Sequence, residues 1–389
     1  MEPLTHAAAG VAALLALPRP VLKRLFCLNR SPCQPYGLSF RGESALFPPG
    51  LDRRALAAVV LISLVPDLDA LSLLAGQQAF LVLHGGLLHG LALVPLLALC
   101  CLPLFRLFRQ AGTPPASWAR VWLFCCGLLC LHLWLDAVTP WGTKLFAPFS
   151  GERWRGNAVS CLDPLMLLAP LAGIILSVRR RSPRPARWAL VWLLGYPCLG
   201  LAYDAILEQA CRADFAAQGR HIGRLAVLPD VFVPGLRRVV YEEELPKMTT
   251  LVCVEGLLAP EHFYGPRLCE FTSRELPAKL RASSPLGAAF LDAALLPWTP
   301  VPPDRATAWA EGEHIVLVQD ERFGSSIPAV RHFLTGFWGD PPAPLRLRQA
   351  YPRDAGGQGP PSREELRLPF GAWTFGRPAP GLDAEPGLR

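Results

Sequence analysis

Long apolar stretches alternate with short polar loops through the first half of the 389-residue chain. The apolar stretches cover residues 1–17, 54–75, 80–105, 121–138, 163–178 and 188–207. A helix needs about 20 apolar residues to cross a bilayer, and several of these stretches reach that length. The pattern therefore predicts a polytopic helical membrane domain of about six segments over residues 1–208.

The pattern changes near Cys211, where the apolar residues form short β-branched runs bounded by Pro or Gly. Such runs are typical of β-strands and predict a small β-rich domain over residues 209–339. Residues 340–389 are dominated by Pro, Gly, Arg and Glu, a composition typical of a disordered tail. The expected fold is mainly α, with the β-rich domain on the exported side of the membrane.

Composition favours a membrane protein and argues against a nucleic-acid partner. Hydrophobic residues make up 51% of the chain and charged residues only 18%, which is too apolar for an ordinary soluble protein. The net charge of +7 comes from arginines that lie mostly in short loops, where they determine topology. No CxxC pair occurs among the twelve cysteines, so a cysteine-built zinc site is not expected. Cys253 and Cys269 could form a disulfide in an exported domain.

The basic loops predict which side of the membrane the polar residues face. Loops over residues 18–54, 106–120 and 178–187 carry positive charge and are expected on the cytoplasmic side. They alternate along a six-segment path, which places both termini outside. In that topology the histidines and aspartates of the apolar stretches all lie near the outer face, and this agreement predicts one shared site.

These ionisable residues are the candidates for chemistry. His132 and Asp136 are four residues apart, so they share one face of a helix. A charge at bilayer depth costs about 2.5–3.5 kcal/mol, so such residues usually face a cavity or bind a ligand. A hydrogen bond between two helices is the alternative. Similar residues recur in other apolar stretches, as His6, Asp67, Asp69, His84, His89 and Asp163.

Histidine nitrogens with aspartate oxygens are the ligand set of zinc and similar first-row metals. The predicted metal ligands are His6, Asp67, Asp69, His84, His89, His132 and Asp136. They exceed the needs of one tetrahedral ion, so they fit two or three metals, or one metal with carboxylates that orient the imidazoles. Zinc is the expected metal and manganese the alternative. Such a centre supplies hydroxide for attack on an ester or phosphoester, with Asp67 or Asp69 as the catalytic general base.

The loop that follows offers groups for an anionic substrate. Thr139, Lys144 and Arg153 are the predicted substrate-binding residues, and Arg155 lies nearby. Anchoring to lipid headgroups is the alternative for the basic side chains. We therefore expect membrane lipids and a small-molecule or lipid substrate as partners, while the sequence does not indicate an oligomeric state.

Other functions are weaker matches to the sequence. It contains no GxSxG nucleophile elbow, no P-loop and no GxGxxG dinucleotide motif. A divalent-metal-ion transporter is the main rival, and it predicts ligands near mid-bilayer with access from both faces. A non-catalytic membrane scaffold is the third possibility, and it predicts that loop residues near the site are freely replaceable.

Several short motifs form an ordered series over residues 1–178. They are Thr5-His6, Pro66-Asp67-Leu68-Asp69, the pair His84 and His89, HxxxDxxTxxG from His132 to Gly142, Pro148-Phe149-Ser150 and Asp163-Pro164. This series resembles the YdjM-like family of LexA-regulated, membrane-bound metal-dependent hydrolases of bacteria. The resemblance implies that the seven predicted ligands are the metal and catalytic residues. It also implies a multi-pass protein of the bacterial inner membrane that acts at the outer face, with a periplasmic C-terminal domain.

The chain departs from the family pattern around the histidine pair. The family usually has Arg after the first histidine and Thr and Ser flanking the second, whereas Gly85, Leu88 and Gly90 stand at these positions. The ligands remain, but substrate contacts differ. The family is distantly similar to zinc-dependent phospholipase C and P1-type nucleases, which are helical and trinuclear. That similarity implies a phosphoester as the bond cleaved.

Overall fold

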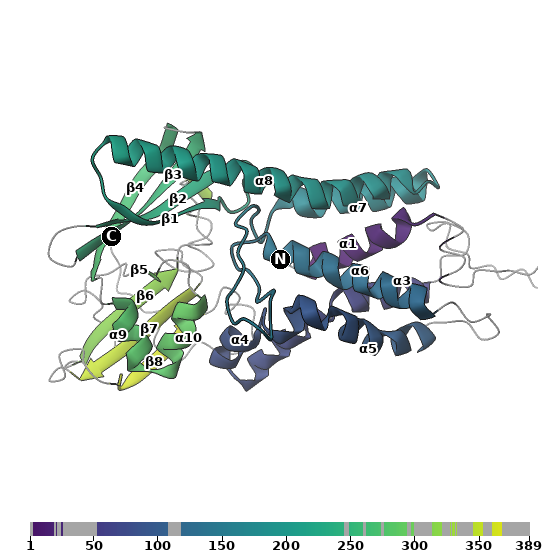
Figure 1. Cartoon of the computed structure of the whole chain (residues 1–389), viewed down its shortest axis with the longest axis horizontal. Helices are drawn as coiled ribbons and strands as arrows, with labels where there is room; N and C mark the ends of the chain where they lie inside the picture. The colour runs from purple at the N-terminus through teal and green to yellow at the C-terminus, as the bar shows by residue number, and fades with distance from the viewer. Residues whose placement is uncertain are drawn as a thin grey trace, which may run out of the picture.

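The computed structural model has a helical half followed by a β-rich half (Figure 1). It describes residues 3–18, 53–107, 118–244, 249–259, 262–273, 276–293, 297–298, 313–320, 345–352 and 360–367, with a few single positions. The predicted mainly helical fold is confirmed at this level, while the domain boundaries and the export of the β-rich half stay predictions.

The helical half runs from α1 to the long helix α8. Short 3₁₀ helices carry the label η. The elements are α1 (Pro3–Ala16), α3 (Arg53–Ser63), η1 (Pro66–Ala75), α4 (Gln77–Leu83), η2 (Leu87–His89), η3 (Leu91–Leu93), α5 (Val94–Leu107), α6 (Trp118–Ala137), α7 (Pro164–Arg179) and α8 (Arg184–Ala217). Helices α1, α3, α5 and α6 run alongside one another, and α7 with the first part of α8 covers α1 (Figure 1).

Four of these helices share one hydrophobic core, to which each contributes buried side chains such as Leu14, Ile62, Val94 and Leu129. Gly10 allows α1 to approach α3 closely, because a Cβ at this position would clash with Oγ of Ser63. The close packing brings the first turns of α1 beside the end of α3.

Two of the described helices, α6 and α8, are long and apolar enough to cross a membrane. The number rises to four if each of two bent pairs counts as one span. One pair bends by 62° between α3 and η1, at the predicted interruption by Pro66, and the other bends by 53° near His89. Helices α1 and α7 are shorter apolar helices. Six spans are therefore not confirmed for the part of the chain that is described.

The stretch over residues 80–105 was predicted to be one continuous segment, but the structure divides it into several short helices. Helix α4 ends at Leu83, and the chain then passes through η2 and η3 before α5 begins at Val94. Gly85 has a φ of +66°, which lies in the left-handed region that glycine adopts readily. This glycine turn in an apolar stretch separates His84, the C-cap of α4, from His89 on η2.

Helix α8 continues to Ala217, beyond the expected end of the sixth segment at Leu207. Its last turns bury Leu207, Cys211 and Phe215, which recur every four residues on one face. These side chains pack against Val227 and Tyr241 of the first sheet. The helix therefore joins the helical half to the β-rich half.

In its described residues, the β-rich half contains two four-stranded antiparallel sheets. The first, in the order β1-β2-β3-β4, consists of Ile222–Pro229, Arg237–Glu244, Thr249–Ala259 and His262–Ser273. The second, in the order β5-β6-β7-β8, consists of Pro297–Trp298, Glu313–Asp320, Leu345–Pro352 and Arg363–Arg367. Cys253 and Cys269 are opposite one another in the register of β3 and β4, and a disulfide between them stays a prediction.

The second sheet packs with α9 (Leu276–Ser283) and α10 (Pro285–Ala293), and together they contact α4. The expectation of a disordered tail from residue 340 is wrong for β7 and β8, which complete this sheet. Leu347 and Ala350 of β7 are buried there. Residues 368–389 lie outside the described part of the chain. Most residues of the basic loops over 18–54 and 106–120 also lie outside it.

Candidate metal centre

Helix α6 supplies two members of the centre from one face near its C-terminal end. His132 and Asp136 are one helical turn apart, and both side chains are buried. Nδ1 of His132 lies 2.7 Å from the backbone carbonyl oxygen of Ser63, the last residue of α3. A carbonyl only accepts a hydrogen bond, so Nδ1 carries the proton and Nε2 presents its lone pair toward the centre.

His6 reaches the same point from the first turns of α1. Its Nε2 lies 3.2 Å from Oδ1 of Asp136. Its ring stacks on that of His132, with the centroids 3.8 Å apart and the planes inclined by 22°. The packing of α1 against α3 that Gly10 permits therefore holds His6 in place.

Asp67 enters from η1, directly after the bend at Pro66. Its Oδ1 lies 3.6 Å from Nε2 of His132. His6, Asp67, His132 and Asp136 each offer one ligand atom, and these atoms all lie within 4.8 Å of one another. This four-residue group is of the size that one metal ion requires.

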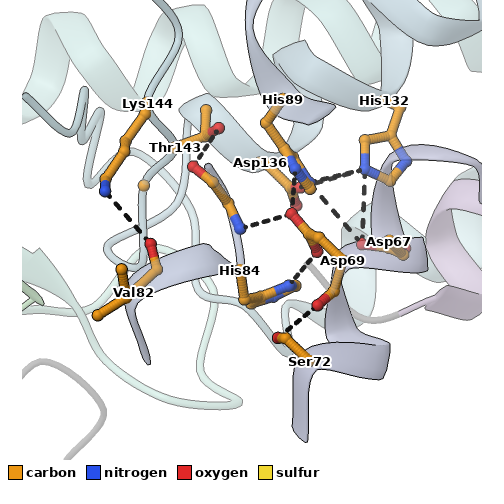
Figure 2. A network of polar contacts seen from close by, with 12 residues as sticks. Asp67, Asp69, Ser72, Val82, His84, His89, His132, Asp136, Thr143 and Lys144 are labelled. Carbon is orange, nitrogen blue, oxygen red and sulfur yellow. Dashed lines mark hydrogen bonds and ion pairs between the residues drawn. The ribbon is translucent and has the colours of Figure 1, made fainter. Parts of the chain in front are cut away.

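His89 is a fifth donor next to the group. It is fully buried on η2, and its Nε2 lies 3.1 Å from Oδ2 of Asp136 and 3.3 Å from Nε2 of His132. The distance from this atom to Oδ1 of Asp67 is 3.9 Å. Figure 2 shows His89, His132 and Asp67 gathered around Asp136. His89 thus extends the set of donors toward η2.

Asp69 connects His84 and His89 on this side of the centre (Figure 2). Its Oδ1 lies 2.7 Å from Nδ1 of His84, and its Oδ2 accepts a hydrogen bond of 3.0 Å from the amide of Gly85. Nδ1 of His89 lies 3.0 Å from the same Oδ2. We call His84, Asp69 and His89 the outer arm. Within it, Asp69 occupies the place of a carboxylate that orients imidazoles.

The donor set fits a divalent cation. Nε2 of His89 and Nε2 of His132 face one another, and Nε2 of His6 joins them at the carboxylate of Asp136. Oδ2 of Asp67, a further buried atom of this group, has no hydrogen-bond partner among the described residues. Buried polar atoms are normally paired, and a cation bound by these nitrogens and oxygens would stabilise the whole group.

The predicted substrate-binding residues lie on the segment over 139–156, which we call the strap. The hydroxyl of Thr139 is buried and donates to the carbonyl of Asp136. Nζ of Lys144 donates to the carbonyl of Val82 at 3.3 Å, and burial together with the neighbouring Arg153 lowers the pKa of Lys144. Arg153 is buried and donates to backbone carbonyls. Of the three, Lys144 is the least enclosed.

Asp163, which the sequence places among the ionisable candidates of the apolar stretches, lies outside the centre. Its Oδ1 accepts hydrogen bonds from the amides of Leu165 and Met166, and its Oδ2 accepts one from the hydroxyl of Tyr196. It is therefore the N-cap of α7, with Pro164 at the first helical position. The Asp-Pro pair before an apolar stretch is a sequence signal for this role.

Two contributors to the centre could not be recognised as site residues from the sequence. Ser63 acts through its backbone carbonyl, which any residue type would provide. Gly10 acts by having no side chain. Sequence motifs find ligand side chains, whereas these two positions support the ligands through backbone and packing.

Comparison with known proteins places these residues in a family context. The profile of a family described as YdjM inner membrane protein matches residues 1–207. The Uncharacterized protein YfhP of Bacillus subtilis (strain 168) is 24% identical over 166 residues, which cover 41% of this chain and 50% of that protein. The chain thus spans half the length of this relative. No solved structure matches the chain. All residues of the four-residue group and the outer arm fall within the range of the family match.

Proposed function

We propose, from the premise that the chain belongs to the YdjM inner membrane protein family, that it is a metal-dependent hydrolase of the bacterial inner membrane. One observation carries the proposal: His6, Asp67, His132 and Asp136 converge from three separate helical elements at the ends of apolar helices. Charged and ionisable groups in such surroundings generally serve a function. Their chemistry is that of a zinc site, with manganese as the alternative.

The four-residue group would hold the first metal ion, and His89 would contribute to it or to a second ion beside it. When bound, a divalent ion lowers the pKa of water and polarises the oxygen of an ester or phosphoester. Oδ2 of Asp67 has no hydrogen-bond partner among the described residues, which suits a general base that accepts a proton from water.

The pair of Asp69 and His84 offers a second proton-transfer group. Asp69 engages Nδ1 of His84, so Nε2 is the atom left to exchange a proton. The side chain of His84 is 19% exposed, in contrast to the fully enclosed His6 and His89. In this proposal Asp69 acts by orienting His84, which refines the catalytic role predicted for it from the sequence.

The substrate we propose is a lipid or lipid-linked phosphoester or ester. Leu68, Leu71 and Leu74 recur every three residues on η1, so they align along one side of this 3₁₀ helix. Their exposed fractions are 54%, 61% and 89%. Asp67 and Asp69 project from the same short helix toward the centre. An apolar ridge beside the reacting groups would hold an acyl chain, and Lys144 would bind the anionic headgroup.

The topology we propose is multi-pass, with the centre at the outer face of the inner membrane and the β-rich half in the periplasm. The centre lies at the ends of α1 and α6 that are nearest the β-rich half (Figure 1). The basic loops predicted to be cytoplasmic join the opposite ends of the helices. Membrane lipids would surround the helical half on this arrangement.

The test is metal content by elemental analysis of detergent-purified protein, followed by hydrolysis of bis(p-nitrophenyl) phosphate. We expect zinc or manganese in stoichiometric amount in the wild type and its loss from the double variant His132→Ala/Asp136→Ala. Absence of metal from the wild type after reconstitution would overturn the proposal. Metal binding without hydrolysis of either ester or phosphoester substrates, combined with ion uptake by proteoliposomes, would favour a transporter.

A further inference from the structure

Two arginines on the strap each bind the C-terminal end of a different helix. Nη2 of Arg153 donates to the carbonyls of Leu81 and His84, at 3.1 Å and 2.7 Å. Nη2 of Arg155 donates to the carbonyls of Asp292 and Ala293, at 3.1 Å and 3.0 Å. The last carbonyls of a helix lack partners within the helix and form its negative end, so a guanidinium stabilises them. The arginines thus tie α4 and α10 to one strap.

The surroundings of Arg153 indicate that it holds the chain near His84. The residue is only 7% exposed, and its guanidinium lies 5.9 Å from the ring centroid of Trp141. Burial of a charge is unfavourable unless hydrogen bonds compensate for it, and the carbonyls of Leu81 and His84 provide them. Leu81 lies in the last turn of α4, and His84 is the first residue after the helix and the first residue of the outer arm. Arg153 therefore binds the backbone on both sides of the helix end.

The turn at His84 and Gly85 is held from two sides. On one side, Asp69 binds the ring of His84 and the amide of Gly85. On the other side, Arg153 binds the carbonyl of His84, and the strap amide of Lys144 donates to the carbonyl of Gly85 at 2.8 Å. A Cβ on Gly85 would lie 2.8 Å from Nη1 of Arg153, so the guanidinium fills the space that any side chain there would need.

We infer that Arg153 is a positioning residue that fixes the backbone of His84 and, through it, the outer arm of the metal centre. It does so in place of the substrate contact predicted from the sequence. The inference rests on the proposed function, since it assigns the arm to a metal centre. Arg155 makes the same kind of bond from the same strap, but its bonds hold α10 of the β-rich half.

The experiment compares Arg153→Ala with the matched variant Arg155→Ala in the full-length, detergent-purified protein. Zinc affinity is measured by competition with a chelator. Loss of a group that supports metal ligands typically weakens binding 10- to 100-fold, so we expect at least about a 10-fold loss for Arg153→Ala and less than a 2-fold change for Arg155→Ala. Arg153→Lys, which keeps the charge and can bond one carbonyl at a time, should give an intermediate loss and guards against misfolding.

Hydrogen–deuterium exchange of the metal-free proteins supplies a readout that does not depend on zinc. Arg153→Ala should increase exchange in the peptide over 80–90 and Arg155→Ala in the peptide over 285–293. Equal zinc affinities of the two variants, or unchanged exchange over 80–90 in Arg153→Ala, would overturn the positioning role. A wild type that binds neither zinc nor manganese would instead overturn the proposed function, and exchange alone would then decide whether Arg153 holds the arm.

Discussion

The two sides of the metal centre are built in different ways. On the inner side, His132 and Asp136 belong to α6, a helix of 20 residues, and His6 belongs to α1, a helix of 14 residues. Both helices are embedded in the hydrophobic core of the helical half. On the outer side, His84 follows the 7-residue helix α4 and His89 lies on a 3-residue 3₁₀ helix.

This difference decides what each side needs in order to keep its geometry. A long helix satisfies its own backbone hydrogen bonds, so packing alone is enough to place its side chains. Short helical segments are marginal by themselves and depend on contacts from other parts of the chain. Asp69 and the strap supply those contacts to the outer arm. The inner side should therefore tolerate changes in the strap, and the outer arm should not.

Asp136 is shared by both sides, so its replacement should have the largest effect. Its carboxylate lies within 3.3 Å of His6, His89 and His132. We expect Asp136→Asn to weaken zinc binding by more than about 100-fold, the upper end of the loss seen when a supporting group is removed. Chelator competition measures this. The control is Asp163→Asn, which alters another buried carboxylate and should leave zinc affinity unchanged. Retention of tight zinc binding by Asp136→Asn would contradict the shared role.

Replacement of Asp69 should affect the outer arm alone. In Asp69→Ala both His84 and His89 lose the carboxylate that orients them, so we expect zinc affinity to fall about 10- to 100-fold. One zinc ion should still bind at saturating concentration, because the four-residue group is intact. Titration with zinc followed by elemental analysis measures both quantities.

The control for this change is Ser72→Ala on the same short helix. The hydroxyl of Ser72 donates to the backbone carbonyl of Asp69, whereas the imidazoles contact its carboxylate. We expect its zinc affinity to match the wild type. A loss in Asp69→Ala as large as that in Asp136→Asn would mean that Asp69 is a metal ligand in its own right, as the sequence first predicted.

The sequence predicted the inner side better than the outer arm. The helical period of α6 places His132 and Asp136 on one face of a long apolar helix, and Pro66 marks the bend that introduces Asp67. Both signals are local, so they can be found in the sequence. The break after His84 is not local in origin, because Asp69 binds the amide of Gly85 and Arg153 binds the carbonyl of His84 from distant parts of the chain.

The contacts of Arg153 on the strap and the last two strands were missed for a related reason. Arg153 lies in a polar stretch, and nothing in the neighbouring residues indicates that its side chain folds inward onto α4. The strand Leu345–Pro352 alternates Leu and Arg over its first four positions, which is a strand signal. The abundance of Pro, Gly and charged residues around it obscured that signal. The composition of all fifty residues from 340 to 389 therefore hid the signal of a strand that is eight residues long.

The smallest predicted effect concerns the packing that places His6 on the inner side. Gly10→Ala adds a methyl group that would clash with Oγ of Ser63. Overpacking of this kind typically costs about 1–3 kcal/mol, so we expect a lower thermal unfolding temperature in detergent.

Gly127→Ala on α6 is the matched control, because no described atom lies within 4 Å of a Cβ at this exposed position. There the helix-favouring alanine should be neutral or stabilise by up to about 1 kcal/mol. The same substitution is thus expected to destabilise the protein at Gly10 and not at Gly127. Ser63→Ala, which removes the clashing hydroxyl but leaves Cβ of residue 63 at 3.1 Å, should restore part of the lost stability to Gly10→Ala. Failure of that rescue would show that α1 is not held against α3 at this point, and the placement of His6 would then need another cause.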